Sequence, residues 1–274
     1  MLDTSRMAQI ALELAELSEM PMDSGVQAEK ECVTRVLAGI DMGTAEVFAA
    51  HQMGYDCVAR HHNLESTMAA MGAMIFHDHR ESMIVQGVPM NIAESIAQIH
   101  KKEADRNFHA SNFEAASQMA KLLGIGFVGL HTPADLLGER LVQARMDVLM
   151  KENPRCTVGD VLEVLMTIRE YRETRQGPEV WVGEKENLTG RIFVRMAGGV
   201  GPKAEEYTAL IEAGIGTFVV MHLDKATEEK LSENRRCNII VAGHMASDSI
   251  GFNKILDAWE KEGDLKIDRI GGIV

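Results

Sequence analysis

Pairs of metal-ligating side chains follow three stretches of the sequence that have the pattern of buried strands. The pairs are His61 with His62, His131 with Asp135, and His244 with Asp248. The members of the second and third pairs are four residues apart, so each pair can project from one face of a helix. Imidazole and carboxylate ligands together suit zinc, manganese, iron, cobalt or nickel, and they do not choose among these metals. The pattern predicts a site for divalent metal ions.

His61 and His62 are adjacent, and this restricts how they can act together. Neighbouring side chains on a regular strand point to opposite faces of the sheet. The two imidazoles can therefore share a site only where the strand ends and the backbone turns. Two adjacent histidines suit two neighbouring ions better than a single ion.

Each pair has a simpler interpretation when it is taken alone. A His/Asp pair at the start of a helix is more often a cap with a satisfied hydrogen bond, and adjacent histidines are more often surface or supporting residues. The three pairs together favour a common site, because the carboxyl ends of parallel strands meet at one edge of a sheet. His77-Asp78-His79 is a competing cluster, which we interpret as a polar surface loop.

The elements that must position these residues alternate between strands and helices. A strand at 35–40, a helix at 45–52 and the strand before His61 form a βαβ unit, and the last hundred residues alternate in the same way. This alternation predicts a layered α/β fold with mostly parallel or mixed sheets. A (β/α) barrel is the least favoured arrangement, because the helical stretch 91–123 leaves few residues for eight even units.

A polar segment with glycine and proline, residues 173–178, is the predicted linker. The first predicted domain, 1–175, carries His61, His62 and Asp135. The second, 176–274, carries His244 and Asp248, and its final helix and strand could pack back onto the first domain.

Composition restricts the class of partner. The chain has 274 residues, 46% of them hydrophobic, and a net charge of 28 − 41 = −13. This negative charge disfavours nucleic acid and anionic membrane surfaces as partners, and a small-molecule substrate is favoured. No apolar run is long enough to span a bilayer, no secretory leader is evident, and the four cysteines are scattered, so we expect a cytoplasmic protein.

A glycine-rich turn follows the predicted strand at 191–196. Gly198, Gly199 and Gly201 could bind an anion through backbone N–H groups ahead of a helix. The turn matches neither dinucleotide-binding nor P-loop spacing, and Pro202 removes one donor, so a tight strand-to-helix turn is the favoured interpretation.

Several short blocks of the sequence occur in an order typical of a known family. They are Asp41-x-x-Thr44, Gly54-Tyr55-Asp56, His61-His62, His131-Thr132-x-x-Asp135 and Gly243-His244-Met245-Ala246-Ser247-Asp248. Together they resemble the Nif-three-like dinuclear-metal family, some of whose members are labelled type-two GTP cyclohydrolase homologues. The segment 22–27 is similar to an early Asp-Asn-Ser-Gly-Leu-Gln segment of that family. This chain departs from the family pattern in having Asn63 where proline is usual and Asp248 where glutamate is usual.

The resemblance implies two intertwined α/β domains, two divalent metal ions in a cleft between them, and a homohexamer. It implies these ligands: His61, His62, Asp135, His244 and Asp248, with His131 as a ligand or as support for one. The three ligand-bearing strand ends favour a metal-dependent hydrolase that acts through a metal-activated water on a small nucleotide-like, phosphorylated or heterocyclic substrate. By resemblance alone, this hydrolase would be GTP cyclohydrolase-like. The alternative is a non-catalytic metal-binding oligomeric scaffold or regulatory interaction protein.

Overall fold

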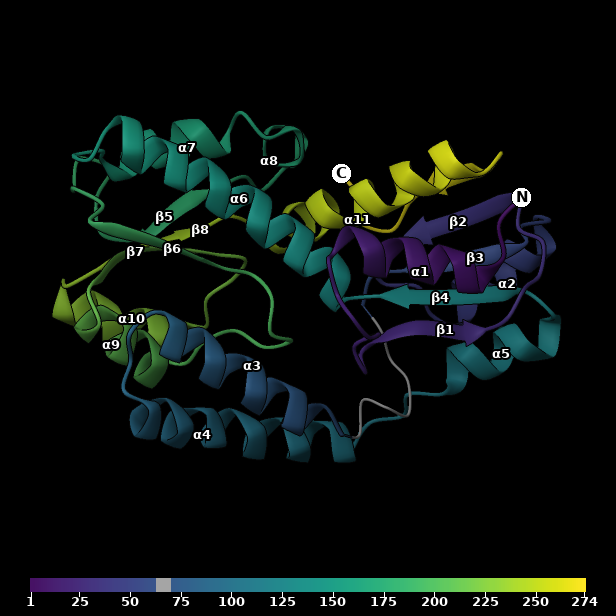
Figure 1. Ribbon diagram of the computed structural model, residues 1–274, viewed down its shortest axis with the longest axis horizontal. Coiled ribbons are helices and arrows are strands. Elements are labelled where there is room, and N and C mark those ends of the chain that lie inside the picture. Colours follow the sequence, from purple (N-terminus) through teal and green to yellow (C-terminus); the bar gives the residue numbers. More distant parts are fainter. Residues whose placement is uncertain (63–69) are drawn as a thin grey trace. The chain divides into compact units, whose positions relative to one another are not determined.

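Two mixed sheets organise the chain, each in its own compact unit, in a computed structural model that describes residues 1–62 and 70–274 (Figure 1). The first unit contains residues 1–71, 105–138 and 248–274, and the second contains 72–104 and 139–247. The chain therefore alternates between the units, and their limits differ from a single boundary at 175. The unit limits fall after the first residue of α3 (Met71–Val85) and inside α4 (Met90–His109), α6 (Thr132–Glu152) and α11 (His244–Glu262).

The sheet of the first unit is mostly parallel. Its strand order is β1 (Ser24–Ala28), β4 (Gly126–Leu130), β3 (Cys57–Arg60), β2 (Arg35–Gly39) and β9 (Lys266–Arg269). Only β1 runs antiparallel to its neighbour, with Ser24 opposite Leu130. The carboxyl ends of β2, β3 and β4 therefore lie at one edge, next to the amino end of β1.

Helices α1 (Thr4–Leu14), α2 (Thr44–Gln52) and α5 (Ala115–Leu123) complete the first unit together with parts of α4, α6 and α11. Small apolar residues of α2 and α5 pack with Val58 and Phe127 of the sheet, which closes the core of this unit. Gly124 ends α5 in the left-handed conformation, with φ 65°, and lets the chain turn at once into β4. Trp259 of α11 donates from Nε1 to the Met7 carbonyl of α1 at 2.8 Å.

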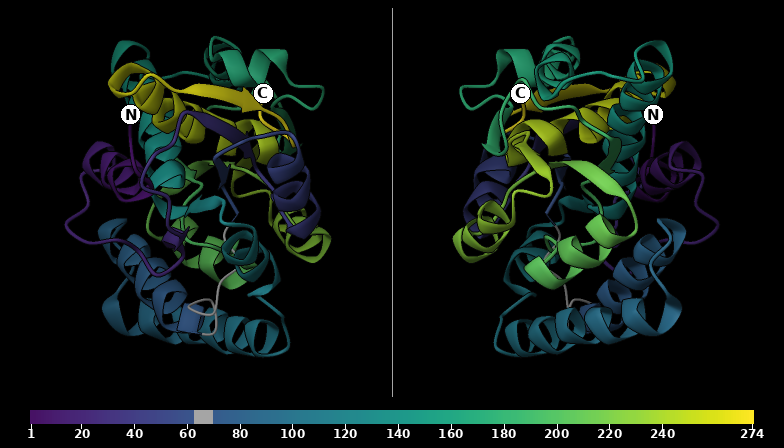
Figure 2. Two further views of the ribbon diagram at one scale, coloured as in Figure 1. Left: turned by 90° about the vertical axis from the view of Figure 1, so that its right-hand side faces the viewer. Right: turned by 90° about the vertical axis from the view of Figure 1, so that its left-hand side faces the viewer.

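The second unit has a four-stranded sheet. Its strand order is β5 (Glu179–Val182), β8 (Asn238–Val241), β7 (Ile215–Val220) and β6 (Arg191–Arg195), with only β5 antiparallel. Its remaining helices are α3 (Met71–Val85), α7 (Val158–Leu165), α8 (Arg169–Glu173), α9 (Ala204–Glu212) and α10 (Lys225–Asn234). Apolar residues of α3, α4, α9 and β7 form one core cluster. Figures 1 and 2 show α3 and α4 side by side.

The α/β fold class with mixed sheets is confirmed, and most predicted strands and helices are present. The barrel alternative is wrong, because the described strands form two separate sheets. The interpretation of 77–79 as a surface loop is also wrong, since these residues lie within α3 and His79 is fully buried. Asn63, one of the departures from the family pattern, falls outside the described residues.

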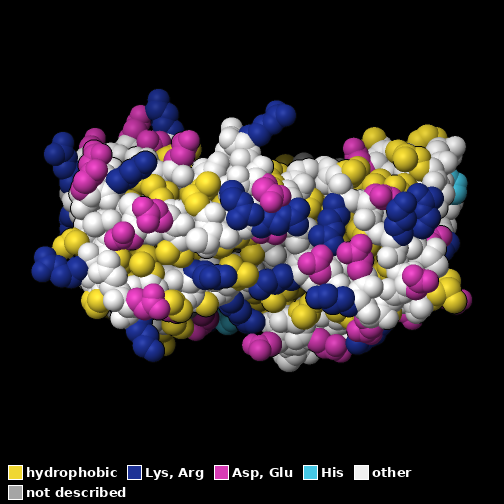
Figure 3. Space-filling view, turned by 90° about the horizontal axis from the view of Figure 1, so that it is seen from above, with side chains coloured by type: hydrophobic (Ala, Val, Ile, Leu, Met, Phe, Trp, Pro, Cys, Tyr) yellow, Lys and Arg dark blue, Asp and Glu magenta, His cyan; other side chains and the backbone are white. Residues whose placement is uncertain are grey.

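The apolar character of the helices and the distribution of surface charge bear on whether a membrane or a charged macromolecule could be a partner. Within residues 1–62 and 70–274, no helix has both the length and the apolar character that crossing a bilayer requires. On the face shown in Figure 3, acidic and basic side chains are interspersed.

Candidate metal centre

His61 and His62 lie where β3 ends, as the sequence predicts. The N–H of His61 donates to the Gly39 carbonyl at 3.2 Å, and the N–H of His62 donates to the Ile40 carbonyl at 3.0 Å. These bonds fix the backbone beside the end of β2. The two imidazole rings have centroids 4.9 Å apart and planes tilted by 47°. His61 is fully buried, whereas the His62 side chain is 22% exposed.

The end of β4 brings a third imidazole and a carboxylate to the same place. His131 follows Leu130, and its ring centroid is 4.9 Å from that of His61 and 5.7 Å from that of His62. Asp135 lies in the first turn of α6, where its N–H donates to the His131 carbonyl at 3.0 Å. One Asp135 oxygen is 3.3 Å from His61 Nε2, and the other is 3.6 Å from His131 Nε2.

Asp248 of α11 supplies the second buried carboxylate. Its Oδ1 is 3.6 Å from His61 Nε2, and its Oδ2 is 3.3 Å from His62 Nε2. Imidazoles and carboxylates thus alternate in the order His62, Asp248, His61, Asp135, His131. Each carboxylate faces the Nε2 atoms of two different histidines, which is an arrangement suited to more than one cation.

A glycine allows the two helices that carry these carboxylates to approach each other. A Cβ atom added at Gly251 of α11 would lie 1.8 Å from the carbonyl oxygen of Ala134 in α6, far inside van der Waals contact. Gly251 and Ala134 are the near neighbours of Asp248 and Asp135 in their helices. This backbone contact therefore sets the separation of the two carboxylates.

Two further aspartates orient the histidines from behind. The Asp23 carboxylate accepts from His131 Nδ1 at 2.7 Å and from Thr132 Oγ1 at 2.7 Å. The Asp41 carboxylate accepts from His62 Nδ1 at 2.8 Å. With the protons on Nδ1, the Nε2 atoms of His62 and His131 present lone pairs toward Asp248 and Asp135. Sequence reasoning did not select Asp23 or Asp41 as site residues, although both stand in the family-like blocks.

The pKa values show that this cluster favours positive charge. Burial opposes the charged form of His131, but Asp135, Asp23 and Asp248 outweigh it and raise the pKa to about 10. Burial likewise opposes the charged form of His62, whose pKa is nevertheless raised by the hydrogen bonds to Asp248 and Asp41. Burial opposes the charged form of Asp23, but the hydrogen bond and charge of His131, together with the bonds from Thr132 and Ser24, lower its pKa.

The separations between donor atoms fit bound cations. Two ligands about 2.1 Å from a tetrahedral ion lie about 3.4 Å from each other. The inner imidazole–carboxylate separations of 3.3–3.6 Å match that value, whereas the outer bonds to Asp23 and Asp41, at 2.7 and 2.8 Å, have hydrogen-bond lengths. Ligand atoms of His61, Asp135 and Asp248 lie within 4.8 Å of one another, as do those of the three histidines. The side chains that are present can therefore hold divalent metal ions.

His244 is the first residue of α11, one helical turn before Asp248. It belongs to the second unit, where its ring centroid is 5.0 Å from that of His222. Because His244 and Asp248 are four residues apart, their side chains lie on one face of α11.

The glycine-rich turn at 196–201 leads from β6 toward α9. Gly198 and Gly199 have positive φ values of 119° and 74°. The N–H groups of Met196 and Ala197 donate to the half-buried carboxylate of Glu139 at 2.7 and 2.9 Å. A side-chain carboxylate thus binds the start of this turn, and anion binding at Gly198, Gly199 and Gly201 stays a prediction.

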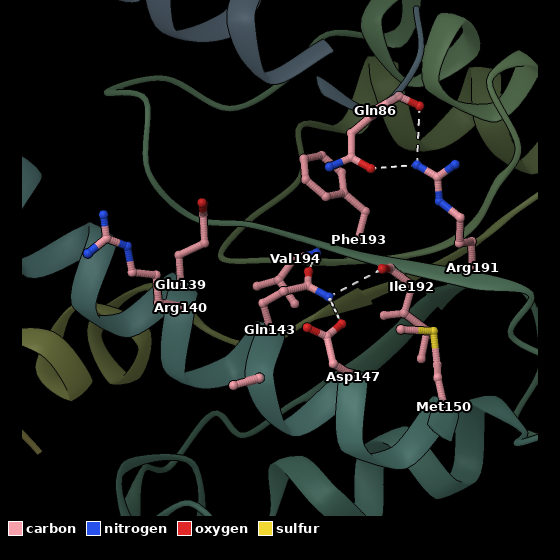
Figure 4. A pocket seen from close by; sticks show the side chains of 11 residues that line it. Gln86, Glu139, Arg140, Gln143, Asp147, Met150, Arg191, Ile192, Phe193 and Val194 are labelled. Atoms are coloured by element: carbon pink, nitrogen blue, oxygen red, sulfur yellow. Dashed lines mark hydrogen bonds between the residues drawn. The ribbon is translucent and has the colours of Figure 1, made fainter. Parts of the chain in front are cut away.

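A separate pocket of about 570 Å³ lies in the second unit between α6 and β6 (Figure 4). Its polar groups largely bond one another. Gln143 donates to Asp147 at 2.8 Å and accepts from the Val194 N–H at 2.9 Å, while Arg191 donates to Gln86. This pocket contains none of the predicted ligands.

Comparison with known proteins gives a whole-chain structural match. No protein-family model and no curated protein sequence matches the chain. Among solved structures, it is similar to a NIF3 superfamily protein from Sphaerobacter thermophilus, with 29% identity, a TM-score of 0.94, and coverage of 99% of this chain and 98% of that one. It shares its fold with the protein ybgI, of unknown function (16% identity, TM-score 0.56, covering 98% of each chain). The chain also shares its fold with reduced HcgD from Methanocaldococcus jannaschii (12% identity, TM-score 0.57, covering 98% of this chain and 97% of that one).

Proposed function

We propose that this chain, which belongs to the NIF3 superfamily, is a dinuclear metal-dependent hydrolase. The observation that carries the proposal is the alternation of three imidazoles and two buried carboxylates at one edge of the sheet of the first unit. Their Nε2–oxygen separations of 3.3–3.6 Å leave room for cations between them. Unlike a cap or a surface cluster, this arrangement gives each carboxylate two facing imidazoles.

The ligands would divide between two ions. His61 and Asp135, with His131 beside them, would hold one ion. His62 and Asp248 would hold the second, with His244 as the further ligand from the same face of α11. Asp248 is one methylene shorter than the glutamate usual in the family, so α11 must lie close to the histidines, and Gly251 permits its approach to α6.

Divalent ions bound here would lower the pKa of a water molecule and polarise a substrate oxygen or imine. Neighbouring carboxylates keep the imidazole ligands in the tautomer and orientation that metal binding requires. Asp23 and Asp41 hold the Nδ1 protons of His131 and His62, which keeps the Nε2 lone pairs directed at the ions. The partial exposure of His62 and His131, 22% and 17% of their side chains, gives a substrate access to this side of the cluster.

The substrate class is a small nucleotide-like, phosphorylated or heterocyclic molecule. The negative net charge of −13 supports a small-molecule substrate rather than nucleic acid. Membership of the NIF3 superfamily supports a homo-oligomer, for which we propose a hexamer, and the scattered cysteines support a cytoplasmic location. The ion could be zinc, manganese, iron, cobalt or nickel.

Screening metal-loaded protein against nucleotides, phosphoesters and pterin precursors tests the hydrolase. Turnover that is lost in His62→Ala and His244→Ala, and retained in His51→Ala on the exposed end of α2, supports it. The second candidate function is a non-catalytic metal-binding scaffold, and the burial of His61, Asp135 and Asp248 favours it. Metal binding without turnover of any of these substrates would support the scaffold.

A further inference from the structure

A second buried group of potential ligands lies entirely within the second unit. His79 comes from α3, His100 from α4 and Glu206 from the first turn of α9. Their residues are 0%, 2% and 0% exposed. One ligand atom from each lies within 4.8 Å of the other two. Three helices that are far apart in the sequence thus bring two imidazoles and one carboxylate together.

The contacts in this group leave several buried polar atoms without a hydrogen bond. His79 Nδ1 is 2.7 Å from Glu206 Oε2, and His100 Nε2 is 2.8 Å from the same oxygen. The contact between His100 Nε2 and Glu206 lacks the alignment of a hydrogen bond. Within residues 1–62 and 70–274, neither Nδ1 nor Nε2 of His100 therefore has a hydrogen-bond partner. His79 Nε2 and Glu206 Oε1 also lack one there. Because buried polar atoms rarely stay unsatisfied in folded proteins, a group of this kind is typical of a place where an ion binds.

The charges around this group also favour a cation. The Arg195 guanidinium, 4% exposed, pairs with Asp78, and Glu139 and Glu206 also act on it. Burial opposes the charged form of Arg195, but these three carboxylates raise its pKa. The pKa of Glu139 is raised by its own burial. The carboxylates of Asp78, Glu139 and Glu206 thus outnumber the single guanidinium of Arg195.

We propose that His79, His100 and Glu206 bind one divalent transition-metal ion of the zinc type, separate from the centre at His61 and Asp248. Two imidazoles and a carboxylate form a common ligand set for such ions, and Glu206 can add its second oxygen. The present separations of 2.7 and 2.8 Å are shorter than the roughly 3.4 Å between two ligands of a tetrahedral ion. Binding of an ion would require each imidazole to lie about 0.6 Å farther from the carboxylate than it does now.

This ion stabilises the unit and does not take part in turnover. All three ligands are buried, so a substrate cannot reach them. The ion would connect α3 and α4 to α9, three helices whose residues Met83, Ala97 and Tyr207 belong to one apolar core cluster. Because the unfolded chain has no such site, metal binding adds directly to the stability of the fold.

Zinc content of the full-length protein tests the proposal. Protein is stripped with chelator, reloaded with excess zinc, freed of unbound ion by gel filtration and subjected to elemental analysis. In the double variant His61→Ala/Asp248→Asn, which disables the first centre, one zinc ion per chain should remain. Adding Glu206→Gln should remove it, while adding His77→Ala, an exposed position on α3, should leave it.

The outcomes separate this site from the proposed function. Absence of zinc from the double variant, or one zinc that persists after Glu206→Gln, overturns the proposal. If the double variant does not fold, Glu206→Gln in the otherwise native chain decides: the loss of one zinc per chain supports the site, and an unchanged zinc content overturns it. Failure of the first centre would instead show as no loss of zinc on His61→Ala/Asp248→Asn.

Discussion

The carbonyl oxygen of Ala134 occupies the space where Gly251 would carry a side chain. A Cβ at that position would lie 1.8 Å from the oxygen, and 3.0 Å from the N–H nitrogen of Gly138. Neither atom belongs to a flexible side chain, so a methyl group there can be accommodated only if α6 and α11 move apart. Asp135 and Asp248 lie one and three residues from these contact positions. The spacing of the candidate ligands thus depends on a residue that carries no ligand.

Gly251→Ala should destabilise the protein and weaken metal binding together. Overpacking of a close backbone contact costs about 1–3 kcal/mol, and a larger separation of Asp135 from Asp248 weakens the shared coordination. Denaturant unfolding and zinc titration measure the two effects. Lys261→Ala, an exposed change in the last turn of α11, should alter stability by less than about 0.5 kcal/mol. Unchanged metal affinity in Gly251→Ala would show that the helix contact does not set the ligand spacing.

Asp23→Asn should lower metal affinity without removing a ligand. The amide can no longer hold the Nδ1 proton of His131 as a carboxylate does, so the imidazole loses its fixed tautomer and orientation. Loss of such support typically costs about 10–100-fold in affinity. A competition assay with a chromophoric chelator measures the change. Glu29→Gln, exposed and just after β1, is the matched control and should bind as the native chain does.

Asp41→Asn provides the corresponding test at His62. Asp41 is largely exposed, with 71% of its side chain accessible, so water can partly replace its bond to His62 Nδ1. We therefore expect a smaller loss of affinity than in Asp23→Asn. An equal or larger loss in Asp41→Asn would contradict the assignment of Asp23 as the stronger support.

Acid sensitivity is expected at Asp56, which anchors the start of β2. Its carboxylate accepts from the Thr34 N–H at 2.8 Å, the Thr34 hydroxyl at 2.7 Å and the Arg35 N–H at 2.9 Å. Burial opposes the charged form, but these bonds outweigh it and lower the pKa of Asp56 below its unfolded value of 3.8. The stabilisation is therefore fully present above the unfolded pKa and is lost as the pH falls through the lower folded pKa.

Asp56→Asn should accordingly be less stable than the native chain at pH 7, by roughly 1 kcal/mol. The difference should shrink as the pH falls below the folded pKa of Asp56, because the native carboxylate is then protonated too. Urea unfolding between neutral pH and about pH 2.5 measures both curves. A stability difference that stays constant over this range would contradict the account of Asp56.

The sequence could predict the positions of the inner candidate ligands because each depends on local patterns. Apolar runs mark β3 and β4, and parallel strands end at one edge, so the convergence of His61, His62 and His131 follows from chain order. The four-residue spacing of His131 and Asp135 likewise places them together at the start of α6. These predictions require no knowledge of packing.

The remaining features depend on contacts between distant segments. Asp23 reaches His131 only because β1 pairs antiparallel with β4, and Ser24-Gly25 has the sequence pattern of a turn. The sequence pattern places His79 in a loop because the polar residues around it hide the buried face of α3. Its partner Glu206 is 127 residues away. The close approach at Gly251 leaves no local pattern at all.

Metal content of the protein purified without chelator tests the central claim most directly. Elemental analysis should find two ions per chain that are lost together in the variant Asp135→Asn/Asp248→Asn, while circular dichroism shows a folded chain. The ion at Glu206 should be unaffected by this change. A folded double variant with the same metal content as the native chain would contradict the account of the centre at His61 and His62.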